Sequence, residues 1–453
     1  RSDLMNVGMH RTFTSGLKNN MHNYSSALIL GCGRSGRAAE RLLTSEGCAT
    51  RVIFEDKDAQ LDCSAVLAEN NFEVCIVSPG FGLSHPWIQA VKAAGVPLLS
   101  ELELGWSRHK GKTIAVTGSN GKSTAVKWIC ESLQRAEKKA SIGGNYGIPA
   151  CEVVLDFPDL DWLVLEVSSF QLETVQEFRA DIAVILNILP NHLDRHETLE
   201  IYRKTKARIF EFGCPSDTCI VPENLIGQFK PDINGARNWV TFGDRDADYS
   251  FESGQIFHRE RALIDLSGTL FDSPVLGRCT GAAVSAVLDV GGINLKYAES
   301  AARCFKPLPH RLERLGELGG VTFINDSKAT NLAALAVALQ ACDRGVHLIA
   351  GGISKESDYT FIKEILAERV QSIYLIGQAS RAMYQAWHEV CLCVECGTLE
   401  EAFSTARNTA EAGEIVLLSP GCASFDQFCS FEERGARFTA LFNNAVHIVK
   451  DAL

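Results

Sequence analysis

Short apolar runs alternate with helical stretches along most of this chain. The first block carries a helical pattern over 35–46 and apolar runs at 27–30, 51–54, 74–77 and 96–99. Strands that alternate with helices are typical of a parallel sheet with crossover helices. The alternation starts again at 113–116, and once more at 322–324 after two prolines within 306–309. The pattern predicts an α/β fold in three domains, which a length of 453 residues also suggests.

The three blocks give approximate domain boundaries. We expect domains over 21–110, 111–306 and 307–453, with residues 1–20 as an extension and Met21 as the initiator. Within the second block, 247–271 is short, polar and rich in turn residues. This segment predicts an antiparallel appendage to the parallel sheet.

The net charge and the lengths of the apolar runs limit the kinds of partner that this protein could bind. The chain has 44 lysines and arginines against 55 aspartates and glutamates, a net charge of −11, which argues against a general nucleic-acid binder. No stretch approaches the ~18 apolar residues of a membrane span. We therefore expect a cytoplasmic protein with no nucleic-acid or membrane partner.

Sixteen cysteines are scattered along the chain rather than concentrated as in a disulfide scaffold. The one tight group is Cys391, Cys393 and Cys396, whose spacing leaves a metal site open. Because the group lies in a strand-like run without a second Cys pair or nearby His pair, we favour reduced, buried cysteines.

A glycine-rich turn follows the first predicted strand. Gly31-Cys32-Gly33-Arg34-Ser35-Gly36 reads GxGxxG, and Asp56 follows 20 residues later. This fits a dinucleotide fingerprint, although any nucleotide diphosphate could use the same helix N-terminus and a purely structural turn remains open. Together with Ser78 at the end of the third strand, it predicts a nucleotide-like ligand at the carboxyl edge of the first sheet.

The stretch TGSNGKST at 117–124 joins a strand to a helix. It supplies backbone donors, a lysine for the β and γ phosphates and a hydroxyl for Mg²⁺. The standard loop has a glycine where this chain has Val116. We interpret it as a shorter variant of a triphosphate-binding loop.

Other polar residues lie at predicted strand ends in the second block. Glu166 ends one strand and could hold a second Mg²⁺, although an exposed or capping glutamate remains an alternative. His192 lies in Asn-His-Leu-Asp-Arg-His after another strand and could bind metal or substrate, or be structural. Lys206 taken alone is one member of a solvated basic face with Arg203, Lys204 and Arg208.

The third block has similar polar segments. They are His310-Arg311, the stretch NDSKATN at 325–331, Lys355 after a Gly-Gly pair, and SPGCASFDQFCSF at 419–431. Each alone is ambiguous between a cap, a turn and a binding segment. Their shared position at strand ends favours a phosphoryl or other anion site.

The stretches TGSNGKST, EVSSFQLE, NHLDRHETLEIYRKTKARI, HRLE, NDSKATN and SPGCASFDQFCSFEERG occur in this order. From about residue 27 to about residue 440 the chain resembles the Mur ligases. The resemblance implies a Rossmann-like N-terminal domain for UDP, a central P-loop-type ATPase domain with a parallel sheet, and a Rossmann-like C-terminal domain for an amino acid.

The resemblance also implies a reaction in peptidoglycan precursor synthesis. ATP would phosphorylate the carboxylate of UDP-N-acetylmuramoyl-L-alanine, and the amine of D-glutamate would attack the acyl phosphate. The SPGCASFDQF stretch favours the D-glutamate-adding members of the family. Two Mg²⁺ ions and a monomeric enzyme are expected.

Residue roles carry over by position as implications of the resemblance. The catalytic residues would be Lys122, Glu166, His192 and Lys206. ATP would be bound by Gly118, Asn120, Gly121, Lys122, Ser123, Thr124, Arg311, Asp326 and Lys328. The metal ions would be held by Ser123, Glu166, His192 and Lys206, the last as a carbamate. The UDP substrate would be bound by Arg34, Ser35, Gly36, Ser78, Asn145 and His192. D-Glutamate would be bound by Thr330, Lys355, Ser424 and Phe431.

The chain departs from the family pattern at two places. Cys279, Thr280 and Ala283 stand where the family usually has a histidine and two asparagines near adenine, and Ile353 replaces an acid. A nucleotide-binding relative with weak or no catalysis therefore remains open. So do a sibling Mur or folylpolyglutamate-type ligase and an NAD-dependent oxidoreductase built on the glycine-rich turn.

Overall fold

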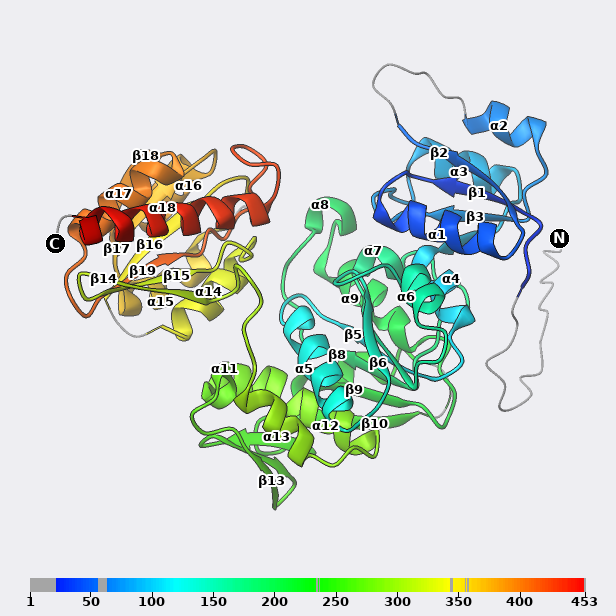
Figure 1. The fold of residues 1–453 in the computed structure, drawn as a ribbon, viewed down its shortest axis with the longest axis horizontal. Coiled ribbons are helices and arrows are strands. Elements are labelled where there is room, and N and C mark those ends of the chain that lie inside the picture. Colours follow the sequence, from blue (N-terminus) through cyan, green and yellow to red (C-terminus); the bar gives the residue numbers. More distant parts are fainter. Residues whose placement is uncertain are drawn as a thin grey trace, which may run out of the picture.

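A computed structural model describes residues 22–55, 63–233, 235, 237–342, 345–354, 356 and 358–451. The expected extension at 1–20, Met21, Asp56 and Lys355 lie outside these residues. Figure 1 shows three α/β bodies, with the N-terminal domain in blue, the central domain in cyan to green and the C-terminal domain in yellow to red. Each is built on its own sheet, which confirms the predicted fold class. No helix in the described ranges is both long and apolar enough to cross a membrane.

The N-terminal sheet has four parallel strands in the order β2-β1-β3-β4. The strands are β1 (Ser26–Leu30), β2 (Ala49–Ile53), β3 (Val74–Val77) and β4 (Leu98–Ser100). The helices are α1 (Arg34–Ser45), α2 (Cys63–Glu69), α3 (Pro86–Ala93) and α4 (Glu101–Arg108). Helices on both faces of a parallel sheet explain why β1 is a continuous apolar run and is almost fully buried.

The central sheet has nine strands in the order β13-β12-β11-β10-β9-β8-β5-β7-β6. They are β5 (Lys112–Thr117), β6 (Ala140–Gly144), β7 (Trp162–Glu166), β8 (Ile182–Ile185), β9 (Thr218–Pro222), β10 (Asn238–Gly243), β11 (Tyr249–Glu252), β12 (Gln255–His258) and β13 (Arg261–Asp265). Strand β12 pairs antiparallel with both β11 and β13. The predicted antiparallel appendage is therefore confirmed.

Helices of several lengths accompany the central sheet. They are α5 (Lys122–Arg135), α6 (Ala150–Asp156), α7 (Ser169–Leu172), α8 (Leu193–His196), α9 (Leu199–Ala207), α10 (Ile226–Phe229), α11 (Pro274–Leu276), α12 (Ala282–Val290) and α13 (Lys296–Arg303). The short helix α8 extends from this domain toward the N-terminal domain (Figure 1).

The C-terminal sheet has six strands in the order β14-β15-β19-β16-β17-β18. They are β14 (Glu313–Leu318), β15 (Val321–Asn325), β16 (Val346–Gly351), β17 (Val370–Ile376), β18 (Leu392–Gly397) and β19 (Ile415–Leu418). Its helices are α14 (Leu332–Gln340), α15 (Lys363–Arg369), α16 (Ser380–Trp387), α17 (Leu399–Thr409) and α18 (Phe431–Asp451). The antiparallel β14–β15 hairpin was not predicted, although Gly319 and Gly320, both at positive φ, form the kind of turn that marks one.

In the tight cysteine group, Cys391 and Cys396 are buried, as expected, whereas Cys393 is half-buried. All sixteen cysteines lie in the described ranges and none forms a disulfide. Cys391 and Cys396 are buried beside or in β18, and no group of three or more metal-ligating side chains occurs among the described residues.

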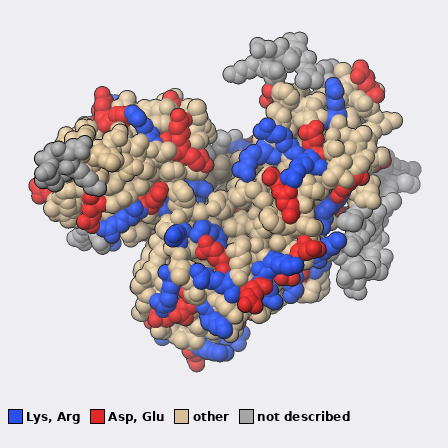
Figure 2. All heavy atoms as spheres, viewed as in Figure 1, with Lys and Arg blue, Asp and Glu red and all other residues tan. Residues whose placement is uncertain are grey.

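The surface carries charges of both signs. Figure 2 shows basic and acidic side chains interspersed on the visible face of all three domains.

Candidate active site

The loop between β5 and α5 is shaped to hold an anion. Gly118 and Gly121 have φ values of 149° and 84°, which side chains other than glycine rarely adopt. Gly121 is the N-cap of α5, so the first turn of the helix, with buried Ser123 and Thr124, points its free N–H groups into the loop. Lys122 Nζ donates to the carbonyls of Gly118 at 2.8 Å and Ser119 at 3.0 Å, which holds the ammonium over the loop.

Asn187, which the sequence analysis missed, fixes the conformation of this loop. Its Oδ1 accepts from the N–H of Asn120 at 2.9 Å and its Nδ2 donates to the Asn120 carbonyl at 3.1 Å. Ser119 Oγ also donates to the carbonyl of Leu189 at 2.9 Å. The available signal was the position of Asn187 just after β8, at the same sheet edge as the loop.

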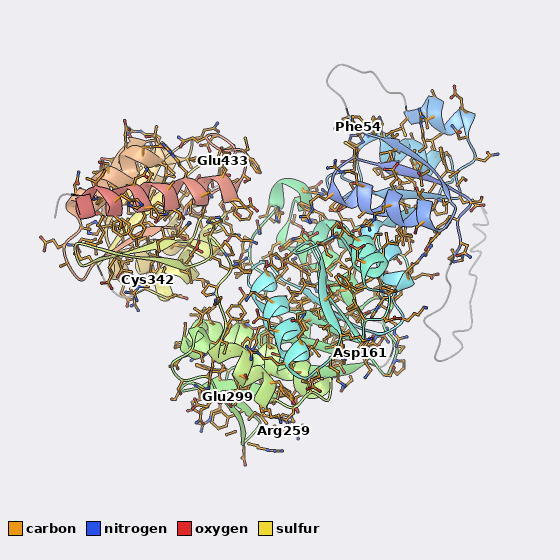
Figure 3. The ribbon with its side chains drawn as sticks, in the orientation of Figure 1. Phe54, Asp161, Arg259, Glu299, Cys342 and Glu433 are labelled. Atoms are coloured by element: carbon orange, nitrogen blue, oxygen red, sulfur yellow. The ribbon has the colours of Figure 1, made fainter. Side chains whose placement is uncertain are left out.

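Glu166 lies at the carboxyl end of β7, beside this loop. Strands β5, β7 and β6 are parallel neighbours, so the residues that end them meet at one edge of the sheet. Glu166 is 3% exposed, and its Oε1 accepts from Asn145 Nδ2 at 2.7 Å. Asp161, labelled in Figure 3, precedes β7 and so lies at the amino end of this strand, away from Glu166.

Lys206 is buried, with 1% of its surface exposed. Its Nζ donates to Thr117 Oγ1 at 3.1 Å and lies 4.7 Å from the centre of the Tyr202 ring. Burial, followed by the nearby charge of Lys122, lowers the pKa of Lys206 well below 10.5, while Glu166 acts in the opposite direction. The alternative of a solvated basic face is wrong for this lysine, because α9 turns it into the sheet edge.

The neighbouring arginine on the same helix is also buried. Arg203 is 8% exposed and pairs with Glu200 and Asp232, both at 2.7 Å. The remaining members of the expected basic face behave differently, since Lys204 is exposed and Arg208 is half-buried. The spacing of charges along the chain therefore did not indicate which of them faces solvent.

His192 precedes α8 in a left-handed conformation with φ of 55°. The left-handed conformation is sterically unfavourable for residues other than glycine, and such strain is concentrated at functional positions. The His192 ring packs edge-on against Phe170, with centres 4.8 Å apart. The Phe170 ring of α7 therefore fixes the position of the imidazole.

The glycine-rich turn of the N-terminal domain is closely packed. A Cβ on Gly36 would lie 1.9 Å from the Gly31 carbonyl oxygen, and one on Gly31 would lie 2.7 Å from Ser78 Oγ. A Cβ on Gly33 would meet nothing within 4 Å. Arg34 Nη2 donates to the Gly147 carbonyl of the central domain at 3.2 Å, while Ser35 lies half-buried in the first turn of α1.

The C-terminal domain brings charged groups to the central domain. Asn331 Nδ2 donates to Asn120 Oδ1 in the phosphate loop at 3.4 Å. Lys328 Nζ lies 5.4 Å from the ring centre of Tyr146, in the central domain, and 5.2 Å from that of Phe431. Burial, then the charge of Arg311, lowers the pKa of Lys328 to about 8. These contacts connect two domains across the loop.

Asp326 is a buried carboxyl group in the same part of the C-terminal domain. It is 5% exposed and accepts from Ser419 Oγ at 2.8 Å and from the Leu312 N–H at 3.1 Å. Burial raises the pKa of Asp326 to about 7, although these hydrogen bonds and the charge of Arg311 act to lower it.

Three of the expected D-glutamate residues lie at the ends of elements in this domain. Phe431 begins α18, Ser424 follows β19 and Thr330 precedes α14.

Several buried polar atoms at these positions have no hydrogen-bond partner in the described part of the chain. They are Ser78 Oγ, Asn120 Nδ2, Glu166 Oε2, Asn191 Oδ1, Arg311 Nε and Ser424 Oγ. Buried polar groups are nearly always paired, so an unpaired one calls for a ligand, ion or water. The free Glu166 oxygen, at the sheet edge that also carries the phosphate loop, fits a hard cation such as Mg²⁺.

Comparison with known proteins agrees with this geometry. The family model described as "Mur ligase middle domain" matches residues 116–282, and that described as "Mur ligase, glutamate ligase domain" matches 310–422. A UDP-N-acetylmuramoylalanine–D-glutamate ligase of Acidobacterium capsulatum is 35% identical over 438 residues, covering 91% of this chain and 95% of that protein. The chain belongs to the Mur ligase family. The D-glutamate ligase match over 91% of the chain favours a ligase over the NAD-dependent oxidoreductase.

Other Mur ligases share the sequence or the fold. A UDP-N-acetylmuramoylalanine–D-glutamate ligase of Aquifex aeolicus is 35% identical, covering 91% of this chain and 97% of that protein. The solved structure of a MurF ligase from Thermotoga maritima in complex with ADP has a TM-score of 0.60 at 16% identity, over 93% of this chain and 95% of that one. MurC from the same organism has a TM-score of 0.59 at 15% identity, over 93% and 100%.

The positions at which this Mur ligase departs from the family pattern lie close to the site. Cys279 and Thr280 belong to a π-helical turn, Gly277–Gly281, that leads into α12. Thr280 Oγ1 lies 3.7 Å from where a Cβ on Gly121 would be, so this turn borders the phosphate loop. Ile353 pairs through its backbone with Ala423, both hydrogen bonds measuring 2.9 Å. Ile353 therefore keeps a place beside the expected D-glutamate residues.

Proposed function

We propose that this chain is an ATP-dependent ligase that adds D-glutamate to UDP-N-acetylmuramoyl-L-alanine in peptidoglycan precursor synthesis. The observation that carries the proposal is the meeting of the phosphate loop, the free Glu166 oxygen and the C-terminal Lys328 around one sheet edge. Relatives named as D-glutamate ligases over 91% of the chain support this choice of amino acid.

The chemistry explains why such a site suits the reaction. A carboxylate is a poor electrophile, and transfer of the γ-phosphoryl group converts it to an acyl phosphate with a good leaving group. The D-glutamate amine then attacks the carbonyl carbon, the amide bond forms, and phosphate leaves. Lys122, Arg311, Lys328 and the N-terminus of α5 neutralise charge on the phosphates, because phosphoryl transfer needs positioning and charge neutralisation above all.

We further propose that Ser123, Glu166, His192 and a carbamate on Lys206 hold two Mg²⁺ ions. Bound Mg²⁺ supplies charge neutralisation and orientation of the phosphates. Burial lowers the pKa of Lys206 and so favours the neutral amine, the form that attacks CO₂ with formation of an N–C bond and release of a proton. A carbamate carbon signal after incubation with ¹³C-bicarbonate, absent in Lys206→Arg, is the expected result.

The substrates are assigned to the three domains in order. The UDP end is held in domain 21–110 by Arg34, Ser35, Gly36 and Ser78, and ATP is held in 111–306. D-Glutamate is held in 307–453 by Thr330, Lys355, Ser424 and Phe431, with Asn145 and His192 near the reacting carboxylate. One chain supplies every group, so we propose a monomer. We place it in the cytoplasm because ATP and UDP-sugars are cytoplasmic substrates.

A phosphate-release assay tests the proposal. We expect phosphate only when ATP, Mg²⁺, UDP-N-acetylmuramoyl-L-alanine and D-glutamate are all present, with D-glutamate preferred over L-alanine, L-lysine and diaminopimelate. Incorporation of another amino acid instead would indicate a sibling ligase. Binding of the UDP substrate without turnover would favour a non-catalytic relative, the candidate that Cys279, Thr280, Ala283 and Ile353 motivate.

A further inference from the structure

The side chain of Arg195, in α8 of the central domain, reaches into the N-terminal domain. Its Nη1 donates to the Pro79 carbonyl at 2.8 Å and its Nη2 to the Phe81 carbonyl at 2.9 Å. These carbonyls belong to the loop 78–85, which follows β3 and begins with Ser78. The guanidinium therefore joins the central domain to the segment that we assign to the UDP end of the substrate.

The other side of the same guanidinium is held within the central domain. Nε and Nη2 donate to the two carboxylate oxygens of Glu173 at 3.0 and 2.6 Å. The guanidinium carbon also lies 4.0 Å from the ring centre of Phe170. A planar fork that is paired with a carboxylate and stacked on a ring has one orientation, which the flexible ammonium of lysine would not reproduce.

The contacts of Arg195 are shared with His192. The N–H groups of Arg195 and His196 donate to the His192 carbonyl at 3.1 and 3.0 Å, which forms the turn that places His192 at positive φ. The Phe170 ring that stacks on Arg195 also packs against the His192 imidazole. A shift of Arg195 would therefore displace both the turn and the ring that position His192.

We propose that Arg195 is a positioning residue that couples the substrate loop 78–85 of the N-terminal domain to His192 at the reaction centre. This inference rests on the proposed function. The UDP-linked substrate must span two domains, because its nucleotide binds in one and its carboxylate reacts in the other. A fixed separation between the two ends raises the effective concentration of the reacting groups.

Arg208 provides a matched control. It donates to the carbonyls of Leu172, Glu173 and Val175, each at 2.7 Å, and pairs with Glu211 at 2.8 Å. All these partners lie in the central domain. Arg208→Lys thus removes the same kind of fork and three carbonyl contacts, one more than Arg195 makes, without touching the N-terminal domain.

The experiment compares Arg195→Lys with Arg208→Lys by steady-state kinetics and by amide hydrogen exchange of the ligand-free proteins. For Arg195→Lys we expect the KM for UDP-N-acetylmuramoyl-L-alanine to rise about tenfold or more, the KM for ATP to stay unchanged, and the loop 78–85 to exchange faster. Arg208→Lys should change neither the KM for the UDP substrate nor exchange in this loop.

Wild-type KM and exchange in Arg195→Lys, or equal effects in both variants, would overturn the proposal. If Arg195→Lys does not fold, Glu173→Gln tests the same coupling, because it weakens the carboxylate pair and leaves both carbonyl acceptors in place. If the wild-type protein does not turn over the UDP substrate, the proposed function fails. The exchange measurement still decides whether Arg195 holds the loop.

Discussion

Glu101 should make the stability of this protein depend on pH. It begins α4, which leads from the N-terminal sheet to the central domain, and it is 2% exposed. Its Oε1 accepts from the Cys151 N–H at 2.7 Å, while Oε2 is buried without a hydrogen-bond partner among the described residues. Burial raises the pKa of Glu101 from 4.5 to about 7, against the hydrogen bond from Cys151.

The sign and size of the effect follow from this pKa. Between pH 4.5 and pH 7 the unfolded chain releases the Glu101 proton while the folded protein retains it. The stabilisation from the protonated group is thus complete below about pH 4.5 and is lost as the pH rises through 7. A gap of about 2.5 pH units corresponds to roughly 3 kcal/mol, since one unit is worth a little over 1 kcal/mol.

The substitution Glu101→Gln tests this reasoning, because glutamine keeps the acceptor and stays neutral at every pH. Between pH 5 and pH 8 we expect the stability of the variant to rise relative to wild type by up to about 3 kcal/mol. At 2–4 °C per kcal/mol, the melting temperatures should diverge by roughly 6–12 °C. The pKa of Glu103 is also raised to about 7, but this group is common to both proteins.

Differential scanning calorimetry at a series of pH values measures the effect. Glu69→Gln is the control, since Glu69 is exposed at the end of α2 and its neutralisation should leave the pH profile as in wild type. Parallel profiles for wild type and Glu101→Gln across this pH range would refute the argument, because they would mean that Glu101 is ionised in the folded protein.

Three further predictions concern the site. The pKa of Lys328 is about 8, so its side chain loses its positive charge as the pH rises above that value. The KM for ATP should therefore increase between pH 7 and pH 9. The variant Lys328→Arg should abolish this increase, because arginine stays charged. Gly36→Ala should destabilise the N-terminal domain by at least about 2 kcal/mol in thermal unfolding, whereas Gly33→Ala should cost about 1 kcal/mol or less. Asn187→Ala removes two hydrogen bonds to the phosphate loop, so kcat/KM for ATP should fall roughly 10–30-fold while the affinity for the UDP substrate stays unchanged.

Local sequence carries much of the architecture of this protein. The alternation of apolar and helical segments predicts the parallel parts of its three sheets, and the runs 27–30 and 74–77 correspond to β1 and β3 to within one residue. The phosphate loop is also readable, because Gly118, Gly121 and Lys122 act through the conformation and backbone of their own segment. Features of this kind depend on residues that are neighbours in the chain.

Other properties were decided by tertiary structure, because they depend on residues far apart in the chain. In the sequence Lys206 is one of several basic residues on a helix. In the structure it is buried at the sheet edge, and burial lowers its pKa. Asn187 belongs to no motif, and Arg195 lies in the NHLDRH stretch without a role that the stretch reveals. The roles of both residues come from carbonyl groups 67 to 116 residues away. Local patterns determine which segments form, whereas the packing of domains determines which charges are desolvated and which groups meet.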